Sequence, residues 1–210
     1  MGFWTDRVVP RITDRALATS EVMELRAQAC AGLHGRVLEL GFGSGLNADA
    51  YPPEVERVDA VEPSEVGWAL SAARRARMRI PVERTGLDGQ RLAAADDQYD
   101  AVLSTFTLCT IPDVDRALVE VRRVLRPGGS FHFLEHGRAP DQGVERWQRR
   151  LDPWQGRMCG GCHLSRDIPA LVAGAGLTLR GVVEAYQPGP RVGRPWTYGY
   201  LGRAEKQIAA

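Results

Sequence analysis

Short apolar runs alternate with amphipathic segments along this chain. The run YDAVLSTF (99–106) is apolar almost throughout, which is typical of a strand covered on both faces. Residues 113–125 place apolar side chains at helical spacing on one face, which predicts an amphipathic helix. Repeated alternation of such segments predicts a doubly wound, Rossmann-like α/β fold with a mostly parallel sheet.

The pattern predicts seven strands and several helices. The strands are expected at residues 36–40, 57–62, 80–85, 99–106, 130–136, 177–185 and 196–203. The helices are expected at residues 13–33, from Ser64 to about 78, 113–125, 143–151 and 168–175, with a short one ending near Tyr51, where two prolines follow. A turn-rich stretch joins the last two strands, which predicts a C-terminal antiparallel hairpin in a seven-stranded sheet.

No linker divides the chain, so residues 1–210 are expected to form a single domain. Residues 1–33 would be an N-terminal helical segment, and residues 34–136 would form the ligand-binding core. Residues 137–210 would add a substrate-side elaboration and the closing strands.

Composition narrows the possible partners and location. Lys+Arg 27 against Asp+Glu 26 gives a net charge of +1, which does not favour nucleic acid as a partner. Arg74, Arg75, Arg77 and Arg79 are best explained as a solvated, helix-closing group. No apolar run approaches the roughly 20 residues of a membrane span. Without an export signal, the four cysteines indicate a cytoplasmic protein with reduced thiols.

The most informative stretch is the glycine turn GFGSG (41–45), which follows the first strand. Such a turn lets the backbone approach a ligand closely. The second strand ends in Glu62, 21 residues after Gly41. A carboxylate at that point can accept hydrogen bonds from both hydroxyls of a ribose. The pair predicts a nucleoside ligand.

The spacing of the glycines indicates which nucleoside. Leu46 stands where the third glycine of the dinucleotide fingerprint would be, which disfavours a nicotinamide-dinucleotide oxidoreductase. The pattern Gly-x-Gly-x-Gly after Glu39, followed by VDAVEPS, YDAVLSTF and LRPGG, resembles the class I S-adenosylmethionine-dependent methyltransferases.

This resemblance implies roles for ten residues around S-adenosylmethionine. Glu39 and the backbone of the three glycines would hold the methionine part, Glu62 the ribose and Pro63 the adenine. Asp88 or Gly89 would read the adenine edge. Ser104 and Thr105 would border the amino group of the cofactor. The implied set is Glu39, Gly41, Gly43, Gly45, Glu62, Pro63, Asp88, Gly89, Ser104 and Thr105.

The C-terminal half narrows the resemblance. The segments STFTLCTIPD, FLEHG, LDPWQ, GCHLSRD and TYGYLGR occur in the order found in the thiol methyltransferase branch of methyltransferase-like proteins. Eukaryotic members carry a hydrophobic N-terminal anchor that this sequence does not show. Quinone C-methyltransferases share the first half but not LDPWQ or GCHLSR. The resemblance implies a small-molecule acceptor, most readily a thiol, with a quinone, a phenol or a phospholipid amine as alternatives.

Several side chains are candidates for acceptor chemistry. A thiol needs only to lose its proton, whereas an oxygen acceptor usually needs a base. His136, at the end of a predicted strand, is the candidate for a base or orienting group. A structural role explains it equally well. The other candidates for the substrate side are Glu135, Trp154, His163, Tyr186, Trp196 and Tyr198, although aromatic residues of this kind are more often part of the core than of a substrate cage.

The string Cys159-Gly-Gly-Cys162-His163 matches the c-type haem attachment motif. We expect no haem, because the nucleoside-binding pattern already accounts for the chain. As a zinc motif it lacks a second pair of ligands, so no metal is expected either. A reversible disulfide between Cys159 and Cys162 stays open, and Cys109 is expected to pack as a small apolar residue.

Overall fold

Seven strands form one sheet, in the order β3-β2-β1-β4-β5-β7-β6. The structure is a computed structural model and describes residues 4–208. β7 pairs antiparallel with both β5 and β6, while the other neighbouring strands are parallel. The strands are β1 (Gly35–Leu40), β2 (Val55–Val61), β3 (Val82–Gly86), β4 (Tyr99–Thr105), β5 (Leu125–His136), β6 (Thr178–Tyr186) and β7 (Tyr198–Glu205). The predicted mostly parallel sheet with a closing antiparallel hairpin is confirmed.

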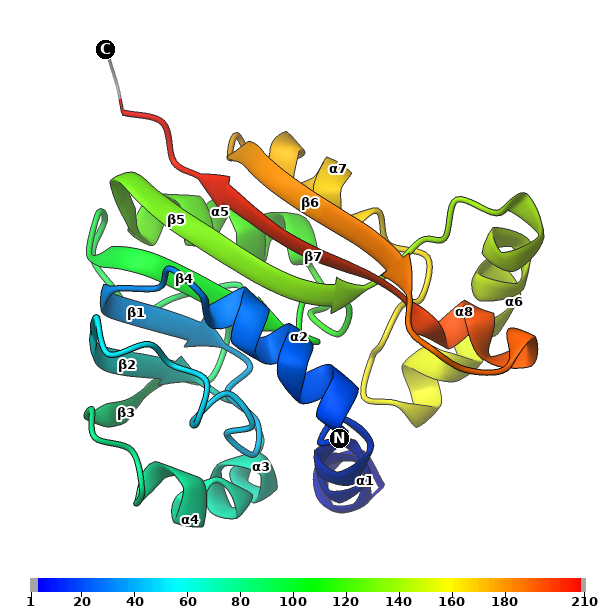
Figure 1. Ribbon diagram of the computed structural model, residues 1–210, viewed down its shortest axis with the longest axis horizontal. Coiled ribbons are helices and arrows are strands. Elements are labelled where there is room, and N and C mark those ends of the chain that lie inside the picture. The colour runs from blue at the N-terminus through cyan, green and yellow to red at the C-terminus, as the bar shows by residue number, and fades with distance from the viewer. Residues whose placement is uncertain (1–3, 209–210) are drawn as a thin grey trace.

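Helices cover both faces of this sheet and its carboxyl edge (Figure 1). α2 lies on one face, α5 and α7 lie on the other, and the strand arrows of β1, β4 and β5 point toward α6 and α8. The helices are η1 (Trp4–Val8, a π-helix), α1 (Val9–Ala16), α2 (Ser20–Cys30), α3 (Glu65–Leu70), α4 (Ala72–Arg75), α5 (Val114–Val124), α6 (Gln142–Met158), α7 (Ile168–Gly174), η2 (Arg191–Gly193) and α8 (Arg194–Thr197).

Local sequence explains the best-predicted elements. α5 begins at Asp113, whose side chain accepts the Arg116 N–H, and its apolar stripe is buried as the spacing predicts. Ser64 likewise accepts the Gly67 N–H at the start of α3. One apolar cluster packs beneath α5 and α7, and a second lies beneath α2.

Four helical predictions need correction. The segment 13–33 is two helices, because the chain turns at residues 17–19 and Thr19 caps α2. Residues 46–50 after the glycine turn form successive turns, with Ala48 bonded to Gly45 and Ala50 to Asn47, before the prolines stop the chain. The helix expected to about residue 78 is broken into α3 and α4. The helix expected over 143–151 is the longer α6, with Pro153 inside it.

The strand predictions shift at the C-terminus, where residues 194–197 form α8 before β7 begins at Tyr198.

The four-arginine group is also less solvated than expected. Arg74 bonds to Asp14 and to the Ser44 carbonyl, and Arg75 lies 3.7 Å from the centre of the Trp68 ring.

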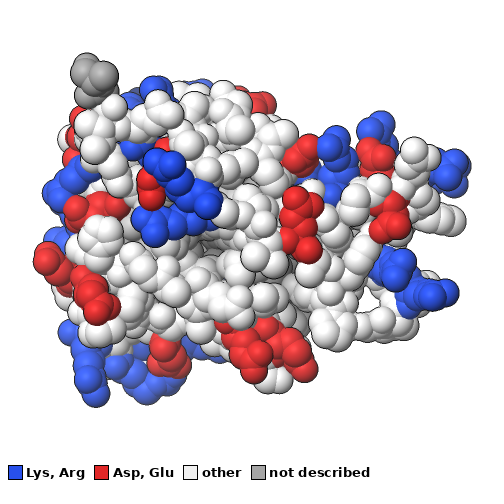
Figure 2. Space-filling view, turned by 45° about the horizontal axis from the view of Figure 1, so that its top comes forward, with Lys and Arg blue, Asp and Glu red and all other residues white. Residues whose placement is uncertain are grey.

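Acidic and basic side chains are interspersed with uncharged surface on the face shown in Figure 2. Within residues 4–208, no helix has the length and apolar character that crossing a membrane requires.

Candidate active site

The glycine turn after β1 is tightly bent and faces open space at its middle residue. Gly41, Gly43 and Gly45 have φ values of 69°, 55° and 77°, in the left-handed region that favours glycine. A Cβ on Gly41 would lie 2.0 Å from Thr107 Oγ1, whereas one on Gly43 would meet nothing closer than 3.8 Å. A ligand can therefore approach the backbone at Gly43, while Gly41 is packed against the segment that follows β4.

Glu62 stands beside this turn, directly after β2. Its side chain is buried, and its two oxygens accept the N–H groups of Gly43 (2.5 Å) and Ser64 (2.6 Å). Burial raises the pKa of Glu62, although these two bonds favour the charged form. Each carboxylate oxygen has a second lone pair, so the group can still accept bonds from two ligand hydroxyls.

Glu39 belongs to a buried polar network that the sequence alone did not reveal. It accepts hydrogen bonds from Asn47 (2.6 Å) and from the Tyr51 hydroxyl. Arg26 of α2 donates to Asn47 Oδ1 (2.9 Å) and to Thr105 Oγ1 (2.8 Å), and its buried Nε has no protein partner. Burial raises the pKa of Glu39 to about 7 despite these bonds. The network lies at the carboxyl ends of β1 and β4, where a polar ligand group can complete it.

One signal in the sequence could have exposed Arg26. It lies four residues after Val22 and three before Ala29, on the buried face of α2. A basic side chain on an otherwise apolar helical stripe requires a buried partner.

Ser104 and Glu135 form one hydrogen-bonded unit between β4 and β5. Glu135 Oε1 accepts the Ser104 hydroxyl (2.7 Å) and the N–H groups of Thr107 and Leu108 (3.0 Å each). The residue is fully buried, Oε2 has no protein partner, and burial raises its pKa. One predicted cofactor residue and one predicted substrate residue are thus directly bonded.

His136 lies close to two cysteines, Cys109 and Cys162, that are distant from it in the sequence. Its Nε2 lies 2.9 Å from Cys162 Sγ, and Cys109 Sγ completes a group whose ligand atoms all lie within 4.8 Å of one another. Hydrogen bonding with Cys109 and the charge of His136 lower the pKa of Cys162 to about 5. Burial would lower the pKa of His136, but the Cys162 sulfur outweighs it and the net shift is upward.

All four cysteines are free thiols, and Cys159 is exposed. Cys109 is buried as expected, but with polar partners. The disulfide between Cys159 and Cys162 that the sequence left open is not present here.

The adenine-side residues lie at the ends of β2 and β3. Pro63 is exposed directly after Glu62, and Asp88 accepts the Gln90 N–H at 2.9 Å. A Cβ on Gly89 would come within 3.3 Å of Ile111. Their roles stay predictions.

The remaining substrate candidates lie around α6 and the hairpin. His163 donates its backbone N–H to the Cys109 carbonyl at 2.8 Å. Tyr186 and Tyr198 pack edge to face at 4.9 Å, and Trp196 donates to Gln155. Trp154, on α6, is 69% exposed, so the structure does not join it to the buried groups. Substrate contact stays a prediction for all of them.

Together these features fit S-adenosylmethionine. The open backbone at Gly43, the buried Glu62 carboxylate and the incompletely paired Arg26 all lie at the carboxyl edge of the sheet, where open α/β folds bind ligands. The fold and site therefore define a class I S-adenosylmethionine-dependent methyltransferase.

Comparisons with known proteins agree with this class. Residues 38–153 match the family model described as "Methyltransferase domain". A solved S-adenosylmethionine-dependent methyltransferase of Thermotoga maritima superposes with a TM-score of 0.69 at 21% identity, covering 98% of this chain and 100% of that one. At that identity the likeness concerns the fold alone.

Sequence relatives define the branch. Human thiol S-methyltransferase TMT1A is 32% identical over 180 residues, covering 82% of this chain and 73% of the human protein. Rat thiol S-methyltransferase TMT1B is 35% identical over 136 residues, 62% of this chain and 55% of its own length. Demethylmenaquinone methyltransferase of Thermobifida fusca is 32% identical over 154 residues, covering 69% of this chain and 65% of its own length. The chain belongs to the methyltransferase domain family, within its thiol S-methyltransferase branch, and the nicotinamide-dependent alternative falls away.

Proposed function

We propose that this methyltransferase transfers the methyl group of S-adenosylmethionine to the sulfur of a small thiol. One observation carries the choice of acceptor. The two segments typical of the thiol branch, LDPWQ and GCHLSRD, are bonded to each other, since the Leu164 N–H donates to Asp152 Oδ1 at 2.6 Å. The second segment also brings Cys162 to His136, at the end of β5.

The chain's contribution to such a reaction is mainly alignment. S-adenosylmethionine supplies a methyl group already activated on a sulfonium. Glu62 would hold the ribose, Gly43 would lie against the cofactor with its bare backbone, and Arg26 with Glu39 would fix the methionine end. Fixing both reactants in line is worth several kcal/mol of the barrier. An ordinary thiol has a pKa near 8.5, so its deprotonation is easily assisted.

Asp88, Gly89, Ser104 and Thr105 keep their proposed places around the cofactor. His136 is proposed to orient or deprotonate the acceptor. Two contacts support this role: His136 directly follows Glu135, which accepts the Ser104 hydroxyl, and its Nε2 lies 2.9 Å from Cys162 Sγ. Pro63 would cover one face of the adenine.

A second acceptor class has one supporting observation. The Thermobifida relative methylates demethylmenaquinone, as its name states, and it matches much of the same chain. Quinone methylation is therefore the alternative to be tested beside thiol methylation.

The test is an acceptor panel with methyl-labelled S-adenosylmethionine. It contains an alkyl thiol, an aryl thiol, a demethylmenaquinone analogue, a simple phenol and phosphatidylethanolamine vesicles. We expect label in the thioether products of the thiols. Label only in the quinone or the lipid would overturn the thiol assignment and leave the methyltransferase assignment intact.

A further inference from the structure

Three side chains of types that bind metal ions, from distant parts of the chain, lie close together beside the proposed active site. Cys109 follows β4, His136 ends β5, and Cys162 lies in the loop after α6. Their ligand atoms lie within 4.8 Å of one another. Cys109 and Cys162 are 1% and 5% exposed, and His136 is half-buried.

Backbone hydrogen bonds hold the segments that carry these groups. The N–H groups of Thr107 and Leu108 donate to Glu135, which fixes the turn before Cys109. The His163 N–H donates to the Cys109 carbonyl, so the loop of Cys162 is bonded directly to that turn. Gly161 makes the approach possible, since its φ is 92° and a Cβ there would lie 3.0 Å from the Thr110 carbonyl oxygen.

Two thiols and one imidazole form a Cys₂His ligand set of the kind that binds Zn²⁺ in known zinc sites. With Zn–S bonds of about 2.3 Å, tetrahedral geometry separates two sulfur ligands by about 3.8 Å. The ligand atoms lie within 4.8 Å of one another, a spread compatible with this geometry after side-chain adjustment. Three protein ligands with one position free is the arrangement of catalytic zinc sites.

A second observation favours a cation here. Glu135 adjoins His136 in sequence, is fully buried, and has one oxygen without a protein partner. A divalent cation bound beside Glu135 would stabilise this unpaired buried oxygen.

We propose that Cys109, His136 and Cys162 bind one Zn²⁺ and leave a fourth position for the sulfur of the acceptor. The second half of this statement rests on the proposed thiol function. With the ion bound, His136 orients the acceptor through the metal and does not take its proton: the acceptor thiol releases its proton to solvent as its sulfur binds the ion. A sulfur lone pair then forms the new S–CH₃ bond while the sulfonium–CH₃ bond breaks, and that electron pair stays on the sulfur of S-adenosylhomocysteine. The products are a methyl thioether, S-adenosylhomocysteine and one proton.

The glycine turn joins this group to the cofactor side. Gly41 packs so closely on Thr107 that even a methyl group would not fit between them. Thr107 lies two residues before Cys109 and is bonded to Glu135, next to His136. The short segment from Thr107 to Cys109 thus contacts both the glycine turn and the proposed ion site. This arrangement would bring the acceptor thiol close to S-adenosylmethionine.

Metal analysis of the full-length protein tests the ion site without any activity assay. After chelation and dialysis against limiting Zn²⁺, we expect about one tightly bound ion per chain. Cys162→Ser and His136→Gln should lower the affinity for Zn²⁺ at least about 10-fold, as loss of a direct ligand requires. Cys159→Ser is the matched control, because Cys159 lies in the same loop but outside the group.

Cobalt substitution gives a readout on the unaltered chain, should the variants fail to fold. Co²⁺ in this site should give a thiolate-to-metal charge-transfer band and the visible bands of tetrahedral cobalt. Loss of those bands in Cys159→Ser as well, binding of less than a tenth of an ion by the wild type, or a Cys109–Cys162 disulfide in the freshly purified protein would overturn the ion site.

An alkyl thiol added to the cobalt form should shift the charge-transfer band, whereas the matching alcohol should not. The acceptor panel separates the two proposals. Thiol methylation at full rate by metal-free protein would reject the zinc role and keep the thiol function. Metal binding without thiol methylation or a thiol-induced shift would keep the ion site and reject its role toward the acceptor.

Discussion

At the scale of single residues, Glu62 carries the clearest prediction. Replacing it with Gln keeps the side-chain volume but removes the charge that two ribose hydroxyls would meet. We expect binding of S-adenosylhomocysteine, measured by calorimetry, to weaken by about 1.5–3 kcal/mol, the range for a hydrogen bond to a charged group. Glu83→Gln is the control, because Glu83 lies on the neighbouring β3 and its side chain is 65% exposed. Equal affinity in wild type and Glu62→Gln would remove the ribose role.

Glu39 predicts a specific pH dependence of stability. Its pKa in the folded protein is about 7, above the value of about 4.3 for an unfolded chain, so between these values the folded state holds the extra proton. The stability that this proton contributes is complete below about pH 4.3 and is lost as pH rises to about 7. We expect the free energy of unfolding of wild type, relative to Glu39→Gln, to fall over that window by an amount on the order of 3 kcal/mol.

Urea unfolding of both proteins at a series of pH values measures this difference, because the other titrating groups largely cancel. A difference that stays flat, or that rises with pH, would show that Glu39 is ionised throughout. The protonation state of Glu39 also matters for function, because a protonated Glu39 donates a hydrogen bond where a carboxylate accepts one.

Candidate site residues could be predicted from the sequence where a short local motif, such as a turn or a strand end, requires a particular residue type. The three glycines and Glu62 follow from a turn and a strand end that lie within 22 residues of each other. The Arg26–Asn47–Thr105 network and the Cys109–Cys162 pairing join residues brought together by the sheet. Nothing local in the sequence specifies those partners, because each depends on which strands become neighbours.

At the scale of elements, the strands were predicted better than the helices. A strand buried on both faces is recognisable as a continuous apolar run. Accordingly, β1, β2 and β4 begin and end within two residues of the expected ranges. The helix ends depended instead on tertiary contacts. The turn segment 46–50 directs Asn47 and Tyr51 toward Glu39, and those bonds take the place of a helical continuation.

The contact of β7 with β5 predicts a matched pair of substitutions. A Cβ on Gly202 of β7 would lie 2.3 Å from the Phe133 ring, which is fully buried, so Gly202→Ala must displace that ring. We expect the free energy of unfolding to fall by about 1–3 kcal/mol, as for an overpacked core. A Cβ on Gly181 of the adjacent β6 would meet nothing within 4 Å, so Gly181→Ala should change stability by less than about 0.5 kcal/mol. Chemical denaturation of both variants tests the contrast, and equal effects would contradict the packing argument.

At the scale of the whole molecule, every proposed functional group lies on one edge of the sheet. The carboxyl ends of the parallel strands point toward α6 and α8, and α1 lies across the lower part of this edge (Figure 1). The sequence predicted the order of strands and helices along the chain. The rule that open α/β sheets bind ligands at the carboxyl ends of their strands predicted which edge carries the proposed site. The sequence did not predict how the N-terminal segment would be placed there: α1 is amphipathic but has no buried residue, so its pattern does not specify a partner.

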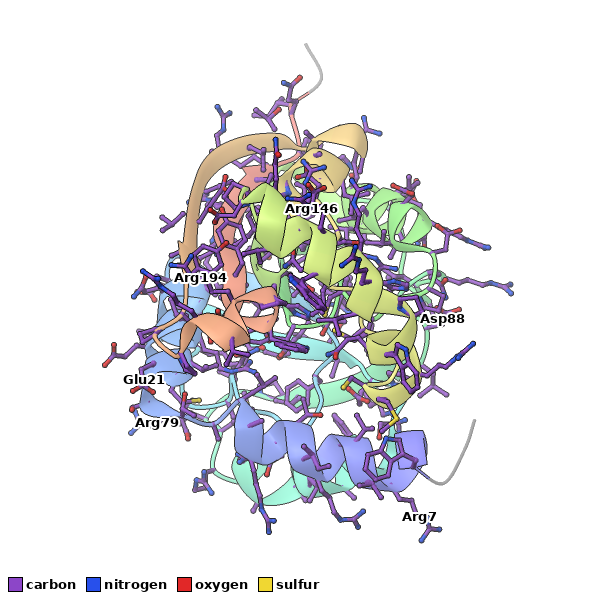
Figure 3. The ribbon with its side chains drawn as sticks, turned by 90° about the vertical axis from the view of Figure 1, so that its right-hand side faces the viewer. Arg7, Glu21, Arg79, Asp88, Arg146 and Arg194 are labelled. Atoms are coloured by element: carbon purple, nitrogen blue, oxygen red, sulfur yellow. The ribbon has the colours of Figure 1, made fainter. Side chains whose placement is uncertain are left out.

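The N-terminal segment bridges the two sides of that edge. Asp14 of α1 pairs with Arg74 of α4 at 2.8 Å, and the Trp4 indole donates to the Met158 carbonyl at the end of α6. Figure 3 shows α6 descending toward η1, which carries Arg7. We expect α1 to open and close over the site while the sheet stays folded, because these bonds hold the segment near its two ends.

Limited trypsin digestion tests this role for α1. Arg11 and Arg15 are exposed on α1, so cleavage there reports local opening of the helix. We expect S-adenosylhomocysteine to slow this cleavage, because bound ligand would favour the closed position. Asp14→Ala removes the ion pair with Arg74 and should speed cleavage several-fold, while denaturant unfolding of the sheet changes by less than about 1 kcal/mol, as for a partly exposed pair. Asp115→Ala, an exposed aspartate on α5, is the control, and cleavage at the same rate with and without ligand would show that α1 does not cover the site.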